Sequence, residues 1–197
     1  MKLPIFPLNG AVLFPGTNLP LNIFEKKYIS VVDYALSNNR LIGMIQKKDD
    51  GNFFNIGCVG KITNFTETTD GRYEINLEGL NRFRFNKITK NEFKFIIADV
   101  DVLISKDVLE TQLNTTNRKL LNSFKKYLHS KKINLNTKEF ENLDNLSLAK
   151  LICVISPLDY LVKQMLLEFD NADDFFKNLL SVLEIEMQSL ENKIKLN

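Results

Sequence analysis

The chain opens with LPIFPL (residues 3–8), VLFPG (residues 12–16) and LPLNIFEKKY (residues 19–28). In these blocks apolar side chains alternate with prolines, which have no backbone N–H to donate to a neighbouring strand. Proline within a sheet is therefore confined to edge strands, strand ends and bulges. The opening segment predicts short strands that lie at an edge of a sheet or bend sharply.

The chain up to about residue 105 predicts further strands and one helix. Several segments are apolar or alternate with period two, which is typical of half-buried strands; they are residues 41–46, 61–65, 72–78, 82–85 and 96–102, and a run beginning at Phe53. Asp-Gly at residues 50–51 and again at 70–71 predicts two tight hairpin turns, because glycine tolerates a positive φ. Gly79 is expected to interrupt the strand that precedes it. Helical spacing of apolar side chains over residues 28–36 predicts one helix among these strands.

From about residue 106 the apolar spacing becomes helical. Two helices are predicted from the apolar positions Leu113, Leu120, Leu121, Phe124 and Leu128, and from Leu146, Leu148, Leu151, Ile152 and Ile155. Ser156, Pro157 and Asp159 match the N-cap, N1 and N3 positions of a third helix, whose apolar stripe is Leu158, Leu161, Val162, Met165 and Leu166. A last helix is expected near Asn171, since Asp173 and Asp174 favour a first turn. Its stripe is Phe176, Leu179, Leu180, Leu183, Met187, Leu190 and Ile194.

Strands followed by helices indicate an α+β protein. We expect a β-rich N-terminal subdomain over residues 1–105 and an α-helical subdomain over residues 106–197. Polar residues 131–143, which have little periodicity, are expected to form a loop between helices.

Composition argues against some classes of function, namely membrane-spanning, secreted and strongly nucleic-acid-binding proteins. The chain has 197 residues with 26 basic and 24 acidic side chains, a net charge of +2, so it carries no strong overall field for nucleic acid or an anionic membrane. No apolar run approaches the roughly 18 residues of a membrane-spanning helix, and the start of the chain does not resemble a secretory signal. Cys58 and Cys153 lie far apart in apolar surroundings and are expected to be reduced core residues. We therefore expect a cytoplasmic, bacterial protein.

Residues for catalysis are scarce. His129 is the one histidine, and neither cysteine has the spacing of a zinc ligand, so no metal site is expected; His129 is expected to cap a helix or lie in solvent. The sequence has no phosphate-binding glycine loop, dinucleotide fingerprint or nucleophile elbow. The carboxylate pairs Asp49-Asp50 and Asp173-Asp174 fit a turn and a first helical turn. We therefore predict no catalytic residue and no cofactor.

Three blocks of the sequence resemble the N-terminal domain of Lon protease. They are the opening segment, then IGCVGKI (residues 56–62) with DGRY (residues 70–73) and LEGLNRF (residues 77–83), and finally Ser-Pro at 156–157 with KQMLLE (residues 163–168). The family usually has Glu-Pro-Arg-Tyr where this chain has Glu25-Lys26-Lys27-Tyr28. The resemblance implies a bent, β-barrel-like unit related to the PUA fold, followed by a helical bundle. It also implies a domain that binds protein substrates, and we expect it to be free-standing, without the ATPase and protease modules.

A domain that binds unfolded protein needs exposed apolar side chains. The rigid turns of the opening segment lead us to expect a protein-binding surface at Phe14, Pro15, Pro20, Ile23 and Phe24. Each large side chain buried in a complex contributes about 1.5–3 kcal/mol. The alternative for these residues is ordinary core packing. The expected partner is an unfolded or partly folded protein, and the stripe of the last helix is a second candidate surface, for self-association.

An RNA-binding protein is the alternative function. It depends on the likeness to the PUA fold and on a cluster of basic residues interleaved with phenylalanines, namely Arg82, Arg84, Lys87, Lys90 and Lys94. Strand alternation favours a simpler interpretation, in which the phenylalanines lie in the core and the basic side chains lie in water.

Overall fold

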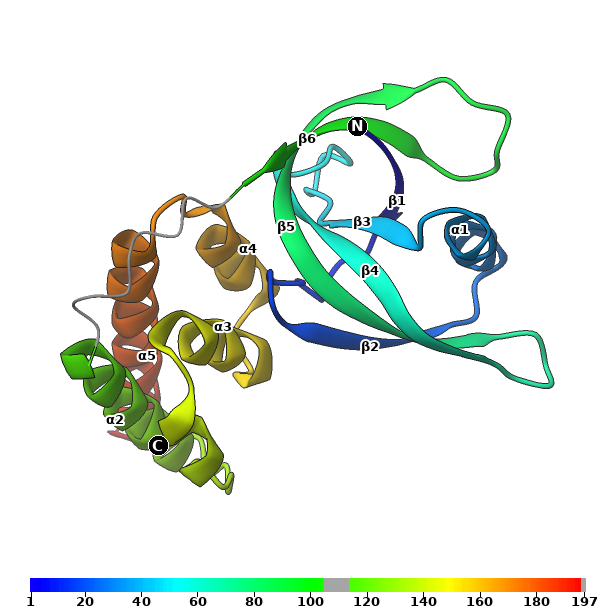
Figure 1. Cartoon of the computed structure of the whole chain (residues 1–197). Helices are drawn as coiled ribbons and strands as arrows, with labels where there is room; N and C mark the ends of the chain where they lie inside the picture. Colours follow the sequence, from blue (N-terminus) through cyan, green and yellow to red (C-terminus); the bar gives the residue numbers. More distant parts are fainter. Residues whose placement is uncertain (105–113, 196–197) are drawn as a thin grey trace. The chain divides into compact units, whose positions relative to one another are not determined.

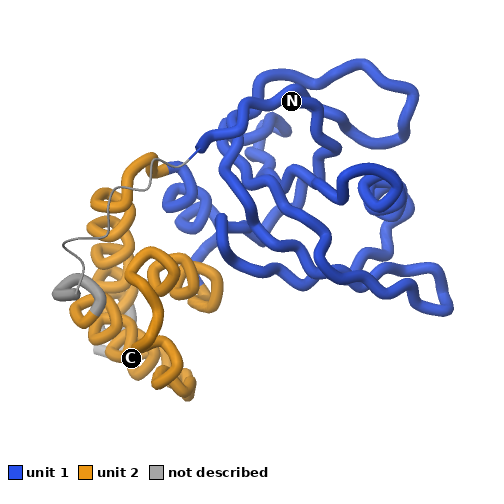
Figure 2. Tube along the Cα trace, viewed as in Figure 1, with its two compact units in different colours: residues 1–105, 158–168 blue, residues 106–157, 169–197 orange. Residues whose placement is uncertain are grey.

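A computed structural model describes residues 1–104 and 114–195, with the side chains of 114–117 and 190–195 left aside. The chain divides into two compact units (Figure 2). The sheet unit comprises residues 1–105 and 158–168, and the helical unit comprises residues 106–157 and 169–197. The subdomain boundary expected between residues 105 and 106 lies outside the described residues and stays a prediction.

A six-stranded sheet forms the body of the sheet unit (Figure 1). Its strands are β1 (Lys2–Pro7), β2 (Asn18–Ile23), β3 (Leu41–Ile45), β4 (Ile56–Glu67), β5 (Tyr73–Thr89) and β6 (Ile97–Leu103). Their order is β2-β5-β4-β3-β1-β6, and β6 pairs a second time with β5. Five strands therefore close into a ring, and β2 lies outside it. The α+β class predicted from the alternating and helical periods is confirmed.

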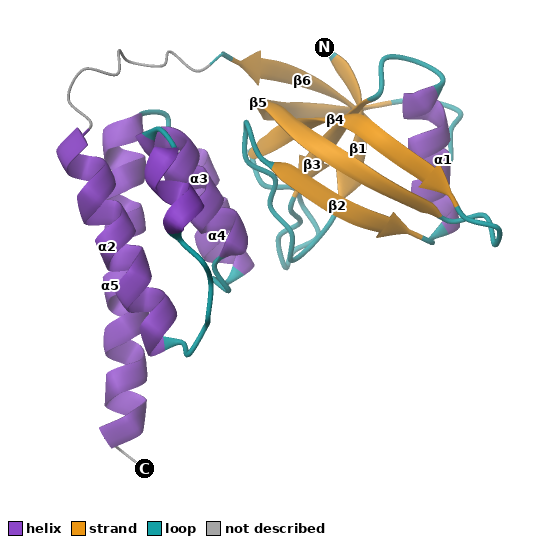
Figure 3. Ribbon diagram, turned by 60° about the horizontal axis from the view of Figure 1, so that its bottom comes forward, coloured by secondary structure: helices purple, strands orange, loops and turns teal. Residues whose placement is uncertain are grey.

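Strand β5 makes this closure possible because it has 17 residues. Its first half pairs with β2, from Ile23 opposite Tyr73 to Asn18 opposite Glu78. Its second half pairs with β6, from Arg82 opposite Leu103 to Thr89 opposite Ile97. The whole strand is curved around the unit (Figure 3).

Both predicted Asp-Gly hairpins are confirmed. Gly51 and Gly71 have φ values of 83° and 77°, which glycine adopts without a Cβ penalty. Their turns join β3 to β4 and β4 to β5, which pair antiparallel. The alternation predicted after Arg72 is also present, since Ile75 and Leu77 are buried and Glu74 and Glu78 are exposed.

The expected interruption at Gly79 is wrong. Strand β5 continues through Gly79, which faces Gly60 of β4 beside an irregularity in the register. The backbone of the opening segment packs directly on this glycine: the Gly79 N–H donates to the Thr17 carbonyl and the Gly16 N–H donates to the Gly79 carbonyl, both at 2.8 Å. Glycine is needed here for close backbone approach and does not break the strand.

Helix α1 (Lys26–Leu36) covers one apolar face of the sheet. Its buried residues Val31, Val32 and Ala35 join a core cluster with residues of β1, β3, β4 and β5. Tyr28 stacks on Phe6 at 4.2 Å and donates its hydroxyl to the Pro7 carbonyl at 3.0 Å. The predicted helix over residues 28–36 is confirmed, and it holds the opening strand in place.

The helical unit contains α2 (Asn114–Ser130), the 3-10 helix η1 (Lys138–Asn142), α3 (Asn145–Ile155) and α5 (Ala172–Lys195). Helix α5 starts as predicted, because Asn171 Oδ1 accepts the Asp174 N–H at 2.8 Å. The buried residues include most of the predicted stripes, among them Leu120, Phe124, Ile152, Phe176 and Leu183. The predicted Leu113 lies outside the described residues, and the side chains of Leu190 and Ile194 are left aside.

The predicted start of the third helix is wrong by three residues. Ser156 ends α3 as its C-cap, and α4 runs over Tyr160–Glu168. Asp159 provides the cap instead, since its Oδ1 accepts the Leu161 N–H at 2.7 Å. The predicted stripe is also only partly correct, because Leu161 and Met165 are exposed. Helix α4 belongs to the sheet unit. It contacts the rest of that unit through a face other than the one that carries Leu161 and Met165.

Candidate protein-binding surface

Two of the five residues predicted to bind protein lie in the core. Phe14 and Ile23 are 2% and 3% exposed, so the expectation that their side chains are partly exposed is wrong. Ile23 belongs to the cluster under α1. Phe14 precedes a turn at Gly16, where φ is 78°, and the backbone contacts of that turn with Gly79 draw Phe14 inward.

The other three predicted residues remain at the surface. Phe24 is 65% exposed, Pro20 is exposed, and Pro15 is partly exposed. Phe24 lies between the end of β2 and the start of α1, where the next residues are charged: Lys27 pairs with Glu25 at 3.0 Å. An exposed aromatic ring with a charged rim is suited to contact an apolar side chain of a partner.

A second group of exposed side chains lies where β4 and β5 meet α1. Phe65 is 45% exposed, and its ring contacts the Tyr73 ring at 6.4 Å with the Arg40 guanidinium 5.9 Å away. The Tyr73 hydroxyl donates to Asp33 Oδ1 at 2.9 Å. This hydrogen bond to a carboxylate favours the neutral phenol and raises the pKa of Tyr73 to about 12. Tyr73 lies opposite Ile23, the last residue of β2, in the β2–β5 ladder.

A third group joins α1 to the loop between β5 and β6. Phe93 and Phe95 stack at 5.0 Å, and Tyr34 of α1 contacts both rings, at 5.0 and 5.4 Å. Phe93 is 50% exposed. No sequence pattern predicted this group, because Tyr34 is separated from Phe93 by nearly 60 residues. The one available signal was that Phe93 lies outside any strand pattern.

The basic cluster proposed for RNA binding does not form one surface. Arg82 is only 8% exposed, and its Nη1 donates to the Leu167 carbonyl of α4 at 3.2 Å. The expectation that all the basic side chains of this cluster lie in water is therefore wrong for Arg82, because α4 covers it. Arg84, Lys87, Lys90 and Lys94 are exposed, and RNA binding through these four stays a prediction.

Gln164 is a buried polar residue that was not predicted from the sequence. It is 1% exposed, and its Nε2 donates to the Ile56 carbonyl at 3.0 Å and to Glu168 Oε1 at 2.9 Å. Together with the Arg82 bond to Leu167, this bond joins α4 to the sheet. A polar side chain inside an apolar helical stripe was the available signal, since such residues are buried only when they are hydrogen-bonded.

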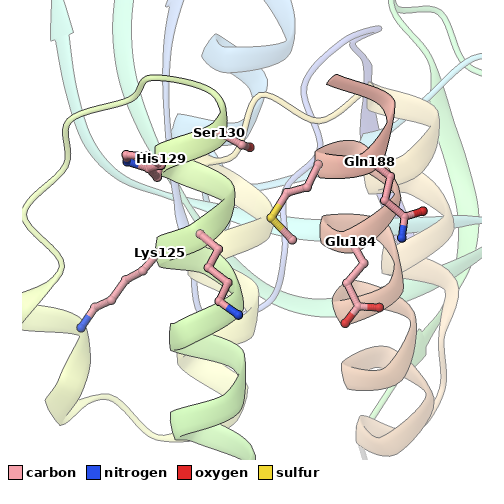
Figure 4. A pocket seen from close by; sticks show the side chains of 7 residues that line it. Lys125, His129, Ser130, Glu184 and Gln188 are labelled. Atoms are coloured by element: carbon pink, nitrogen blue, oxygen red, sulfur yellow. The ribbon is translucent and has the colours of Figure 1, made fainter. Parts of the chain in front are cut away.

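In the helical unit, a groove of about 690 Å³ lies between α2 and α5 (Figure 4). Its lining is Lys125, Lys126, His129, Ser130, Glu184, Met187 and Gln188. His129 is exposed in the last turn of α2, as predicted. Nearby, Lys131 pairs with Glu186 at 2.7 Å and Lys125 with Glu141 at 3.1 Å. Charges of both signs therefore surround the groove, and its chemistry selects no single class of ligand.

Residues 1–104 and 114–195 hold neither a metal-binding cluster nor a helix able to span a membrane. No group of three or more His, Cys, Asp or Glu side chains in this part of the chain is placed to hold a metal ion. No helix described there combines the length and the apolar character that crossing a membrane requires. Cys58 and Cys153 are both buried, as predicted.

Comparison with known proteins adds the family context. A model of the ATP-dependent protease La (LON) substrate-binding domain matches residues 2–184. Lon protease of Buchnera aphidicola subsp. Schizaphis graminum is 29% identical over 203 residues, which cover 97% of this chain and 26% of that protein. Lon protease of Cytophaga hutchinsonii is 30% identical over 207 residues, which cover 97% of this chain and 25% of that protein. The chain thus spans about a quarter of the length of these curated relatives.

Solved structures agree on the fold. A Lon N-terminal domain protein from Xanthomonas campestris superposes with a TM-score of 0.71 at 21% identity, covering 92% of this chain and 98% of that one. The N-terminal domain of Lon protease from the Mycobacterium avium complex superposes with a TM-score of 0.72 at 15% identity, covering 95% and 98%. At these identities the likeness establishes the fold alone.

Proposed function

The chain belongs to the LON substrate-binding domain family, and on that basis we propose that it binds unfolded or partly folded protein segments without catalysing a reaction itself. The observation that carries the proposal is the match of this family model to residues 2–184, most of the chain. The exposed Phe24 and Pro20 support it, because a binding domain for non-native protein needs accessible apolar side chains.

The surface around Phe24 sets the expected strength of binding. Burying one large apolar side chain contributes about 1.5–3 kcal/mol, whereas micromolar binding requires about 8 kcal/mol. With Phe14 and Ile23 in the core, Phe24 is the one large side chain of the predicted set that a partner can reach. Binding in the micromolar range therefore requires further contacts, for which the exposed Phe65 and the backbone of β2 are candidates.

The experiment measures binding of a permanently unfolded protein, reduced and carboxymethylated α-lactalbumin, by fluorescence anisotropy. We expect the unfolded form to bind and the native, disulfide-bonded form not to bind. The Phe24→Ser variant should bind about tenfold to a hundredfold more weakly, since it loses one buried aromatic contact.

A matched control is Ile88→Ser, which removes an apolar side chain that is 57% exposed on the second half of β5. This variant should bind like the unsubstituted chain. Equal binding of native and unfolded α-lactalbumin would contradict the proposal. Hydrolysis of peptide or ATP by the purified chain, removed by one substitution in it, would contradict the absence of catalysis.

A further inference from the structure

Strand β2 has a free edge, to which the proposed function assigns no role. Among the described residues, β2 pairs with β5 alone, and every other strand pairs on two sides. An exposed strand edge presents unpaired N–H and C=O groups and is a ready template for another extended chain. We propose, on the basis of the function proposed above, that β2 receives an extended segment of the bound protein as an additional antiparallel or parallel strand.

Backbone parity identifies the groups that face outward. The Thr17 carbonyl accepts from Gly79 N–H of β5 at 2.8 Å, and alternate residues of a strand direct their backbone groups to the same side. Leu19, Leu21 and Ile23 therefore bond to β5, whereas Asn18, Pro20 and Asn22 direct theirs away from it. This parity accounts for Pro20, because a residue with no N–H leaves no gap in the β5 ladder when it faces the free edge.

The hydrogen-bonding capacity of this edge selects an extended backbone as occupant. Asn18 and Asn22 each offer an N–H and a C=O, and Pro20 offers a C=O between them. All three residues are exposed. Donors and acceptors repeating every second residue along a strand are complemented by another strand, which is the β-augmentation mode of peptide recognition.

The side chains on the two faces of β2 determine which segment of the bound protein fits best beside it. Leu19 and Leu21 are partly buried against the core, so an apolar residue of the added strand would complete their cover. On the opposite face, Asn18 and Asn22 stand opposite Glu78 and Glu74 of β5, and Lys61 of β4 is opposite Glu78. The fitting segment alternates apolar with polar or basic side chains.

The test uses a fluorescent eight-residue probe that alternates Val or Phe with Thr or Lys, and the full chain. Two series of the probe carry backbone N-methyl groups, one at odd and one at even positions. Because only alternate residues of an added strand face β2, one series should lose at least about tenfold in affinity and the other should stay within about twofold. Equal loss in both series, or no loss in either, would overturn the proposal.

A protein variant provides the complementary measurement. Asn22→Pro removes one outward N–H at a position equivalent to Pro20, and it should weaken probe binding about threefold to tenfold, the effect of one hydrogen bond. Asn22→Ala removes the same side chain but keeps the N–H, and it should bind within about twofold of the unsubstituted chain. If Asn22→Pro does not fold, the N-methyl series still decides the outcome on the unsubstituted chain.

Other outcomes separate this inference from the function it rests on. If the probe and unfolded α-lactalbumin bind but neither series shows alternation, the strand-addition inference fails and the proposed function stands. If neither ligand binds, both fail. Concentration-dependent dimers in sedimentation velocity that Asn22→Pro abolishes would assign the edge to a second copy of the chain and overturn the inference.

Discussion

Gly79 of β5 lies against the turn over residues 14–17, and replacing it by alanine is expected to destabilise the sheet unit. An added Cβ would overlap the Phe14 carbonyl oxygen, lie 2.9 Å from the Phe14 carbonyl carbon and come within 3.2 Å of the Leu13 side chain. Backbone atoms cannot rotate away as a flexible side chain can. The turn over residues 14–17 must therefore move as a unit.

The size of the effect follows from what that movement breaks. Overpacking a filled interior costs typically about 1–3 kcal/mol, and the two 2.8 Å hydrogen bonds between Gly79 and the turn contribute roughly 0.5–1.5 kcal/mol each. We expect Gly79→Ala to lower the free energy of unfolding by about 2–6 kcal/mol. The turn also carries Pro15 and leads into β2, so binding to unfolded α-lactalbumin should weaken in parallel.

Urea denaturation followed by circular dichroism measures this change. The control is Gly51→Ala, where an added Cβ meets nothing within 4 Å and the cost arises from the φ of 83° alone, about 1–2 kcal/mol. Gly79 has no such positive φ, so its cost comes from the steric overlap. A Gly79→Ala variant as stable as the unsubstituted chain to within about 0.5 kcal/mol would refute this reasoning about backbone contact.

Three further substitutions test the buried polar groups. Tyr127→Phe should leave stability unchanged or raise it by up to about 1 kcal/mol in urea denaturation, because the Tyr127 hydroxyl is buried without a hydrogen-bond partner among the described residues; a clear loss of stability would show a missed partner. Burial, with a smaller effect of Glu186, raises the pKa of Tyr127 to about 12. The folded state therefore favours the neutral phenol. The stability that the neutral Tyr127 contributes is complete below pH 10 and is lost as the pH rises towards 12. The decline of the thermal midpoint above pH 10 should thus be shallower in Tyr127→Phe, and an unchanged decline would argue against that pKa. Gln164→Leu should cost about 1–3 kcal/mol, because the Ile56 carbonyl loses its 3.0 Å partner in a buried site; Gln164→Glu at low pH, where the neutral carboxyl can donate, should recover part of that loss.

Local patterns predicted most elements of this chain. The Asp-Gly turns, the alternating strands and the start of α5 are set by neighbours a few residues apart, through φ preferences, period-two burial and first-turn capping. The same reasoning failed at Ser156, where a good N-cap sequence ends one helix and Asp159 starts the next. Two acceptable caps a few residues apart are equivalent locally, and the choice between them depends on how each helix packs within its own unit.

The candidate surface was harder to predict because exposure depends on distant contacts. Phe14 and Phe24 both follow apolar residues in a proline-rich segment, yet they are 2% and 65% exposed. Phe14 is buried because its turn meets Gly79, about 65 residues later, and no local pattern encodes that contact. Arg82 likewise alternates with Phe83 as a solvent-facing residue would, but α4 contributes the Leu167 carbonyl that binds it.

Residue order and composition were therefore enough to predict the α+β class, the family likeness and the hairpins, and to single out candidate side chains for a protein partner, of which Phe14 and Ile23 proved to be buried. Which of those side chains reach solvent, and which strand keeps an open edge, emerged only when β5 curved far enough to pair with both β2 and β6. Whether a side chain is buried, and which strands pair, depends on contacts with residues that are remote in sequence. Short-range periodicity reports the face on which a side chain lies, and chain closure determines whether anything covers that face.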